Sequence, residues 1–427
     1  MPMDSSRFRT ALEHAPLVCA GGSTVAILVG IAPSQILLGA AIAALLAART
    51  RWRWPAVWLP LALFLAGTLI SMAFSGDPLA GFPQVKKIYV FLMLPVVYTA
   101  VRKIGQARVL VLAWAGAASA GAVLALVQFL QKVREAHAAG QSLYEYYVGS
   151  RITGFMSHWQ TFGGEQMIAL VMLGAFLMFS PRARRWALWL GLAATALLLA
   201  AILVDYTRGI WLATGCACVY LMWFWKRRLL AAVPLAVLLV LWIDPGSVRE
   251  RFESAFQPHG DMDSNQFRVV VWRTGLRMIE AHPLLGLGPE LVHKHFMEWL
   301  PADVPRPLPQ GWYGHLHNIY LHYAAERGIP TMLALVTALL MMLRDFGRAL
   351  RRLAPGRDDR RFLLHGAIAS VIAVMISGFF ELNLGDSEVL TMFLSVAALG
   401  YLAAEVSPAA GSASGTAGSP AAPPASS

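Results

Sequence analysis

Residues 186–204 read WALWLGLAATALLLAAILV, a run of nineteen residues without a charged side chain. The hydrocarbon core of a bilayer is about 30 Å thick, and an α-helix needs roughly 20 apolar residues to cross it. Arginines precede the run at positions 182, 184 and 185, and Asp205 follows it. The length of the run and its charged borders predict a membrane-spanning helix.

The rest of the chain repeats this pattern. Its 427 residues are 57% apolar and only 14% charged, whereas about a quarter of an average soluble domain is charged. Eleven further apolar runs lie at 16–31, 34–48, 55–74, 88–101, 109–131, 162–180, 209–225, 229–243, 318–343, 362–380 and 388–405. The first two also fit one hairpin broken at Pro33. We predict an all-α polytopic membrane protein with about 12 transmembrane helices.

Basic residues predict how these spans are oriented, because short cytoplasmic loops carry an excess of Lys and Arg. With the amino terminus in the cytoplasm and twelve spans, 21 of the 35 basic residues fall on the cytoplasmic side. Half of the other 14 lie in one long loop, residues 244–316. Long loops cross the membrane largely regardless of charge. Both termini are therefore predicted to be cytoplasmic, with the 244–316 loop on the outer side.

The chain divides into two predicted parts. Residues 1–405 form one transmembrane domain that contains the outer loop. Residues 406–427 are rich in Ala, Ser, Gly and Pro and carry no charge, so we expect a disordered cytoplasmic tail. The net charge of +11 comes mostly from the cytoplasmic clusters. Membrane lipids are therefore expected partners and nucleic acid is not.

The outer loop contains a predicted helix, QFRVVVWRTGLRMIEA, at 266–281. At 100° per residue, Arg273 and Arg277 fall on one side of this helix and Arg268 on the opposite, apolar side. An arginine on the apolar face of an amphipathic helix is unusual. Arg268 either extends to water from the start of the helix or points into a cavity between the loop and the spans.

Asp261 and Asp263 have the D-x-D spacing that holds divalent metals in some sugar transferases. They lie in a polar stretch rich in turn-forming residues, so a solvated turn is the expected structure. Because no other carboxylate cluster supports a metal site, we predict no metal and no other cofactor.

The chain re-enters the membrane at GWYGHLHNIYLHYAAERGIP, residues 311–330. A single histidine at the membrane–water boundary is more often a polar anchor than a catalyst. His315 and His317, with Tyr313 and Asn318 beneath a basic loop, favour chemistry, because an imidazole can take a proton near neutral pH. Small residues at helical spacing after His317 predict that another helix approaches closely.

Two more arginines lie at the outer ends of predicted spans. Arg208, in DYTRGIW, either pairs locally with Asp205 or faces an outer cavity. Arg151 opens the segment that precedes the 162–180 run. An ionisable residue at membrane depth is a functional candidate by default.

Taken together, these features resemble the O-antigen ligase family, within the wider group of O-antigen ligases and polymerases. The marker is His-Asn-x9-Gly-Ile, from His317 and Asn318 to Gly328 and Ile329, placed after one large outer loop late in the chain. Other segments that resemble the family lie at 268–290, 151–154 and 207–209. One departure is His158-Trp159-Gln160, which stands where many relatives have a Pro-Asn pair.

The resemblance implies glycosyl transfer at the periplasmic face of the bacterial inner membrane. The donor would be O-antigen carried on undecaprenyl diphosphate. The acceptor would be a sugar hydroxyl of lipid A–core, attacked without a metal and with inversion of the anomeric centre. The product would be lipopolysaccharide.

Three sets of residues fit this chemistry. His317 is the candidate base for the acceptor hydroxyl. The candidates that would orient the hydroxyl or hold the acceptor are His315, Tyr313 and Asn318. The candidates for binding the diphosphate are Arg151, Arg208 and Arg268. A guanidinium suits that role because it binds phosphate bidentately and keeps its charge.

Two other functions fit parts of the sequence. An O-antigen polymerase would use the same donor and fold, with another lipid-linked glycan as acceptor, and the His-Asn-x9-Gly signature favours the ligase. A transporter or flippase of lipid-linked glycans would predict repeated halves and charges at mid-membrane. Here the ionisable residues gather at the outer boundary of the spans, which favours an interfacial enzyme.

Overall fold

The structure of the chain is a computed structural model that describes residues 5–181, 185–256, 264–309, 311–354, 356 and 358–405. Two sequence predictions, the disordered tail at 406–427 and the Asp261–Asp263 turn, lie outside these residues. All of the regular structure in the described residues is helical.

Every predicted apolar run contains at least one helix. The helices of the amino-terminal half are α1 (Ser5–Ala26), α2 (Ile31–Ala47), α3 (Trp58–Ala73), η1 (Pro78–Gly81), α4 (Phe82–Lys87), η2 (Ile88–Leu92), α5 (Met93–Ala100), α6 (Ile104–Ala138), α7 (Leu143–Val148), α8 (Trp159–Phe179) and α9 (Arg185–Val204). Those that follow are α10 (Arg208–Lys226), η3 (Arg227–Ala232), α11 (Val233–Ile243), α12 (Val248–Glu253), α13 (Ser264–Ala281), α14 (Leu291–His295), α15 (Ile319–Arg327), α16 (Ile329–Arg352), α17 (Asp359–Ser377), η5 (Asn383–Gly385) and α18 (Ser387–Ala404).

Seven helical stretches of the described chain are long and apolar enough to cross a membrane. They are Pro78–Ala100, Ile104–Ala138, Trp159–Phe179, Arg185–Val204, Ile329–Arg352, Asp359–Ser377 and Ser387–Ala404. The helices α2 and α3 are apolar but shorter. An all-α membrane architecture is thus supported, while the count of twelve spans and their orientation stay predictions.

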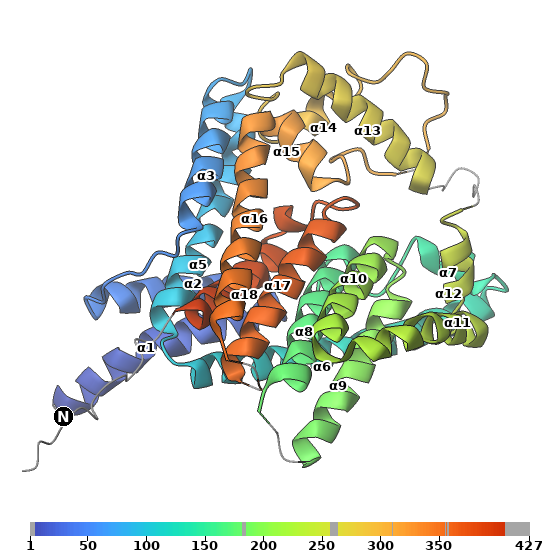
Figure 1. Ribbon diagram of the computed structural model, residues 1–427. Helices are drawn as coiled ribbons and strands as arrows, with labels where there is room; N and C mark the ends of the chain where they lie inside the picture. The colour runs from blue at the N-terminus through green and yellow to red at the C-terminus, as the bar shows by residue number, and fades with distance from the viewer. Residues whose placement is uncertain are drawn as a thin grey trace, which may run out of the picture.

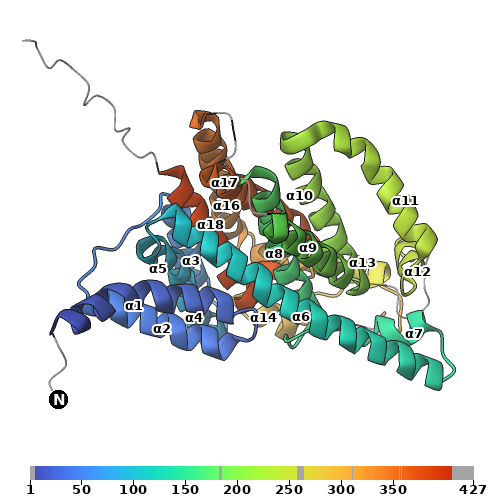
Figure 2. The ribbon, with the colours of Figure 1, turned by 90° about the horizontal axis from the view of Figure 1, so that it is seen from below.

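The helices α8, α17 and α18 form the centre of the bundle. In the apolar part of α8, 83% of the residues are buried, and in that of α18 the share is 89%, against 22% for the peripheral α9. A helix that is apolar on all sides needs such a central place or a lipid environment. Figure 2 shows α6 crossing the bundle obliquely and α11 standing away from α8 and α9.

The segment predicted to be the outer loop forms a small helical layer at one end of the bundle. Figure 1 shows α13, α14 and α15 together there, beside the ends of α3 and α16. This layer has a hydrophobic core of its own, in which Val271, Met278 and Phe296 are nearly or fully buried. This core holds α13 against α15, so that residues near position 270 lie beside residues near position 320.

The predicted run at 318–343 is two helices, α15 and α16, which are separated at Gly328. Gly328 has φ 83° and ψ 158°, a region that almost only glycine occupies. The backbone N–H of Ile329 donates to the carbonyl of Pro283 at 2.8 Å. The sequence predicted that another helix approaches this face closely. The segment that approaches Gly328 is instead the loop after α13.

Replacing Gly328 with alanine is expected to destabilise the protein strongly. A Cβ atom there would overlap the carbonyl oxygen of Leu284, and the backbone conformation alone is unfavourable by about 1–3 kcal/mol for other residues. Gly347→Ala is the matched control, because a Cβ at that position in α16 meets no atom within 4 Å. The apparent melting temperature in detergent should fall by several degrees for Gly328→Ala only. Equal melting temperatures for the two variants would show that the loop after α13 can move away from the added Cβ atom.

Candidate active site

A cavity of about 950 Å³ lies where the helical layer of the outer loop meets the bundle. This volume is near the upper end of the range for small-molecule sites. Its lining is rich in ionisable side chains. The basic ones are Lys87, Arg151, Arg208, Arg251, Arg268, Arg327, His158, His315, His317 and His322, and the acidic ones are Glu290, Glu326, Glu381, Asp386 and Glu388.

His317 stands directly before α15 and lines the cavity. The helix begins at Ile319 because the side chain of Asn318 accepts hydrogen bonds from the N–H groups of Tyr320 and Leu321, each at 3.0 Å. His317 itself has φ 46°, a left-handed conformation that few residues other than glycine adopt. Such backbone outliers persist where the surroundings hold them, and they cluster at functional sites.

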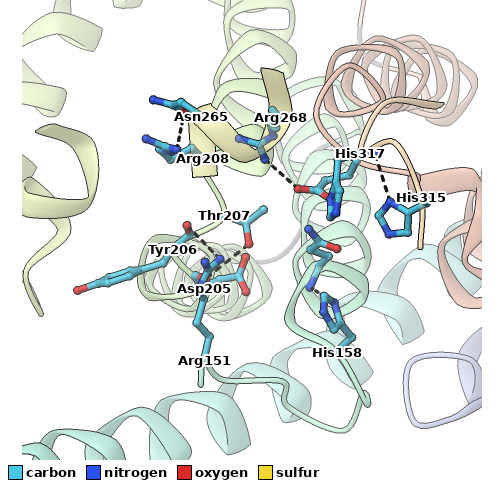
Figure 3. Close-up of polar contacts among 12 residues, drawn as sticks. Arg151, His158, Asp205, Tyr206, Thr207, Arg208, Asn265, Arg268, His315 and His317 are labelled. Atoms are coloured by element: carbon cyan, nitrogen blue, oxygen red, sulfur yellow. Dashed lines mark hydrogen bonds and ion pairs between the residues drawn. The ribbon is translucent and has the colours of Figure 1, made fainter. Parts of the chain in front are cut away.

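Glu381 joins His317 to Arg268. Its Oε2 atom lies 3.2 Å from Nδ1 of His317, and its Oε1 atom accepts a hydrogen bond from Nη2 of Arg268 at 3.2 Å. The side chain of Glu381 is only 5% exposed. In Figure 3, the side chains of Arg268 and His317 approach each other from α13 and from the segment before α15. We call this arrangement the Glu381 bridge.

The Glu381 bridge decides which nitrogen of His317 is available. A carboxylate at Nδ1 favours the proton on that nitrogen and leaves Nε2 as an acceptor. In the part of the chain that the structure describes, Nε2 of His317 is buried and has no hydrogen-bond partner. The ring is thus arranged to take a proton from a group bound in the cavity.

His315 supports His317 from the side. The ring centroids are 4.0 Å apart, and the backbone N–H of His317 donates to Nδ1 of His315 at 3.2 Å. Burial, with His317 and His322 nearby, lowers the pKa of His315 to about 2. His315 is therefore neutral at physiological pH and can accept this bond.

Three further arginines line the cavity near the start of α10. Arg208 donates to Asn265 at 3.0 Å and contacts Ser254 at 3.4 Å. Arg151 and Arg251 converge on the carbonyl oxygen of Tyr206, at 3.4 and 2.9 Å. Burial lowers the pKa of Arg151 to about 10, which still leaves it charged at neutral pH.

Arg151 and Arg251 bring positive charge to the cavity lining. Within the described residues, neither Arg151 nor Arg251 has a carboxylate at salt-bridge distance, and their hydrogen bonds go to neutral oxygens. Arg151 also stacks over the ring of Trp159 at 5.0 Å. A cavity wall of this kind is suited to a bound anion such as a phosphate.

The structure thus brings five of the predicted site residues to one cavity: Arg151, Arg208, Arg268, His315 and His317. Tyr313 and Asn318 do not line it. The hydroxyl of Tyr313 donates to the carbonyl of Pro309 at 2.6 Å, and its ring packs on Phe267. Asn318 caps α15. Both residues therefore hold the segment that carries His317.

Several cavity residues were not among the predicted site residues. Among the ionisable ones are Glu381, Arg251, His158, Asp386, Glu388, Lys87, Glu290, His322, Glu326 and Arg327. Glu381 directly follows the apolar run at 362–380, so it had the same signal, an ionisable residue at the end of a span, that identified Arg208. His158 caps α8, because its Nδ1 accepts from the N–H of Gln160 at 3.2 Å.

Asp205 does not pair locally with Arg208. Its side chain is fully buried, and neither carboxylate oxygen has a hydrogen-bond partner among the residues described. Burial raises the pKa of Asp205 to about 7. The folded protein therefore binds a proton at Asp205 more tightly than the unfolded chain does.

This gives a pH-dependent prediction for Asp205→Asn. As the pH rises from about 4 to 7, the unfolded chain gives up this proton before the folded protein does, so the parent loses stability through that window. The variant lacks this loss. Its apparent melting temperature relative to the parent should rise by several degrees between pH 5 and pH 8. Glu145→Gln, an exposed site, is the control. A difference in melting temperature between variant and parent that does not change with pH would contradict the raised pKa of Asp205.

Comparison with known proteins agrees with the resemblance seen in the sequence. Residues 193–336 match the family model described as O-antigen ligase, which confirms that resemblance. The matched region contains Arg208, Arg268 and His317 and the whole helical layer. No curated protein matches the chain. The family includes both ligases and polymerases of O-antigen, so the match does not distinguish these two activities.

Proposed function

We propose that this chain is an O-antigen ligase of the bacterial inner membrane. It would transfer O-antigen from undecaprenyl diphosphate to a sugar hydroxyl of lipid A–core at the periplasmic face, with both termini in the cytoplasm. The observation that carries the proposal is the Glu381 bridge, which holds a proton acceptor, His317, beside a phosphate-binding group, Arg268. Transfer of a sugar from a diphosphate needs these two groups at the same place.

The arginines would stabilise the leaving group. When the bond between the anomeric carbon and the diphosphate oxygen breaks, its electron pair stays on the diphosphate, whose negative charge increases. Four arginines that line the cavity would face that charge: Arg151, Arg208, Arg251 and Arg268. Fixed positive groups in a site that excludes water act more strongly than the same groups in bulk solvent. No metal is needed to carry the charge.

His317 would act on the acceptor. The hydroxyl oxygen of lipid A–core attacks the anomeric carbon and its proton passes to Nε2 of His317, the nitrogen that has no partner in the described structure. Glu381 then stabilises the positively charged imidazole through Nδ1, as a carboxylate does in other base-assisted transfers. Direct attack opposite the diphosphate inverts the anomeric centre.

The test is transfer by the purified protein in nanodiscs, run in parallel without and with EDTA. Undecaprenyl-diphosphate-linked O-antigen is supplied with and without lipid A–core. We expect a ladder of larger lipid A–core species, formed only with both substrates. Donor chains that lengthen without lipid A–core would instead show a polymerase. Loss of product on adding EDTA would contradict metal independence, and no product under conditions where another ligase works would contradict the enzyme.

A further inference from the structure

The cavity lining includes two groups of side chains with opposite charge, which we call the arginine side and the carboxylate side. The arginine side consists of Arg151, Arg208, Arg251 and Arg268. The carboxylate side consists of Asp386 and Glu388, together with Thr161 and Lys87. The charge of Glu381 acts on both Arg151 and Asp386, so the Glu381 bridge lies within electrostatic reach of each side.

Asp386 and Glu388 lie at the start of α18. Oδ2 of Asp386 accepts a hydrogen bond from the hydroxyl of Thr161, in the first turn of α8, at 3.0 Å. Glu388 is only 8% exposed yet lines the cavity. In the described residues its carboxylate has no partner apart from its own backbone N–H. A buried carboxylate of this kind has unused capacity to accept hydrogen bonds.

Within the described residues, neither of these two carboxylates forms a salt bridge. Lys87 is the cation that acts on both, and its ammonium donates to the carbonyl of Gly385 at 3.1 Å. One turn after Thr161 on the same face of α8, Glu165 is 1% exposed, and both its oxygens lack partners within the described chain. Its charged neighbours are Glu388 and Asp386. Hydrogen-bond donors from a bound ligand would therefore stabilise these carboxylates, whose negative charges otherwise repel one another.

The chemistry of the carboxylate side selects its ligand. Ionised carboxylates only accept hydrogen bonds, and O–H···O⁻ bonds are short and strong. A phosphate would meet two negative groups, with Lys87 as the cation that acts on them, and would be repelled. A sugar with several free hydroxyls offers the donors that are missing.

We propose that the carboxylate side binds the acceptor saccharide, and that the sugars next to its reactive hydroxyl are uncharged and rich in hydroxyl groups. The choice of acceptor over donor rests on the proposed function. In an inverting transfer the attacking hydroxyl lies opposite the leaving diphosphate. If the arginine side holds the diphosphate, the carboxylate side is the part of the lining left for the acceptor.

The first test measures binding, so that it does not depend on turnover. Neutral core oligosaccharide, freed of lipid A, and a matched oligosaccharide phosphorylated near the reactive end are titrated into the full-length protein by calorimetry. The neutral ligand should bind at least about tenfold more tightly, and Asp386→Asn and Glu388→Gln should each weaken it about tenfold or more. Glu145→Gln is the control for an exposed carboxylate. Equal binding of both ligands, or variants that bind like the parent, would overturn the proposal.

The second test divides acceptor from donor. In the transfer assay, Glu388→Gln should raise KM for lipid A–core and leave KM for the lipid-linked donor unchanged, whereas Arg208→Ala should do the reverse. A rise in donor KM for Glu388→Gln would show that the carboxylate side holds the donor glycan and would overturn the assignment. Saccharide binding without any transfer product would keep the sugar site and reject the ligase function.

Discussion

Replacing His317 with alanine lowers the turnover number for O-antigen transfer about 10²–10⁴-fold, the range expected when a general base is removed. The acceptor hydroxyl then has no positioned base to receive its proton. The KM for the lipid-linked donor changes little, because the arginine side remains. Turnover is measured from the rate at which lipid A–core shifts to the ladder.

His293→Ala is the matched control for this variant. His293 is an exposed histidine of the same helical layer, in α14, and does not line the cavity. It should transfer at the rate of the parent. If His317→Ala kept more than a tenth of the parent's turnover and only raised the acceptor KM, His317 would position the hydroxyl without taking its proton.

Replacing Arg268 with alanine lowers kcat/KM for the donor about 10²–10³-fold, as the loss of one group that stabilises developing charge does elsewhere. Two effects combine in this variant. The diphosphate loses a guanidinium, and the carboxylate of Glu381 loses the hydrogen bond at 3.2 Å that balances its charge. Initial rates at varied donor concentration give both kcat and KM.

Arg277→Ala serves as its control, because Arg277 lies on the exposed face of the same helix, α13. It removes the same charge from the layer and should leave donor kinetics within about twofold of the parent, since exposed charges interact weakly through water. Arg268→Lys should remain impaired, because an ammonium cannot replace a bidentate fork. Full activity of Arg268→Lys would mean that charge alone suffices.

Much of the fold follows from the sequence, because long apolar runs with charged borders are helical in a membrane. The break between α15 and α16 did not follow, although Gly328 and Pro330 were visible. A glycine in an apolar run is tolerated in many membrane helices, and the reason for the break is a contact with Leu284 in another segment. Contacts of that kind have no local signature.

The candidate site was predictable where a residue conflicts with its own surroundings. Arg268 was notable as an arginine on an apolar helix face, and it lines the cavity. Glu381 also stands at the end of an apolar run, but its partner His317 lies 64 positions away in the sequence, so the pairing itself has no local signal. Tyr313 and Asn318 were proposed because they are near His317 along the chain, yet folding turns their side chains toward the backbone.

The single carboxylate of Glu381 also constrains how this site can evolve. Because Arg268 and His317 share it, substitutions at the three positions should show epistasis: a second change should matter much less once the first has broken the bridge. Most single substitutions at these three positions would therefore abolish function. A relative with a different set of residues there would have to have replaced all three. The Glu381 bridge thus restricts which residues can replace these three during evolution.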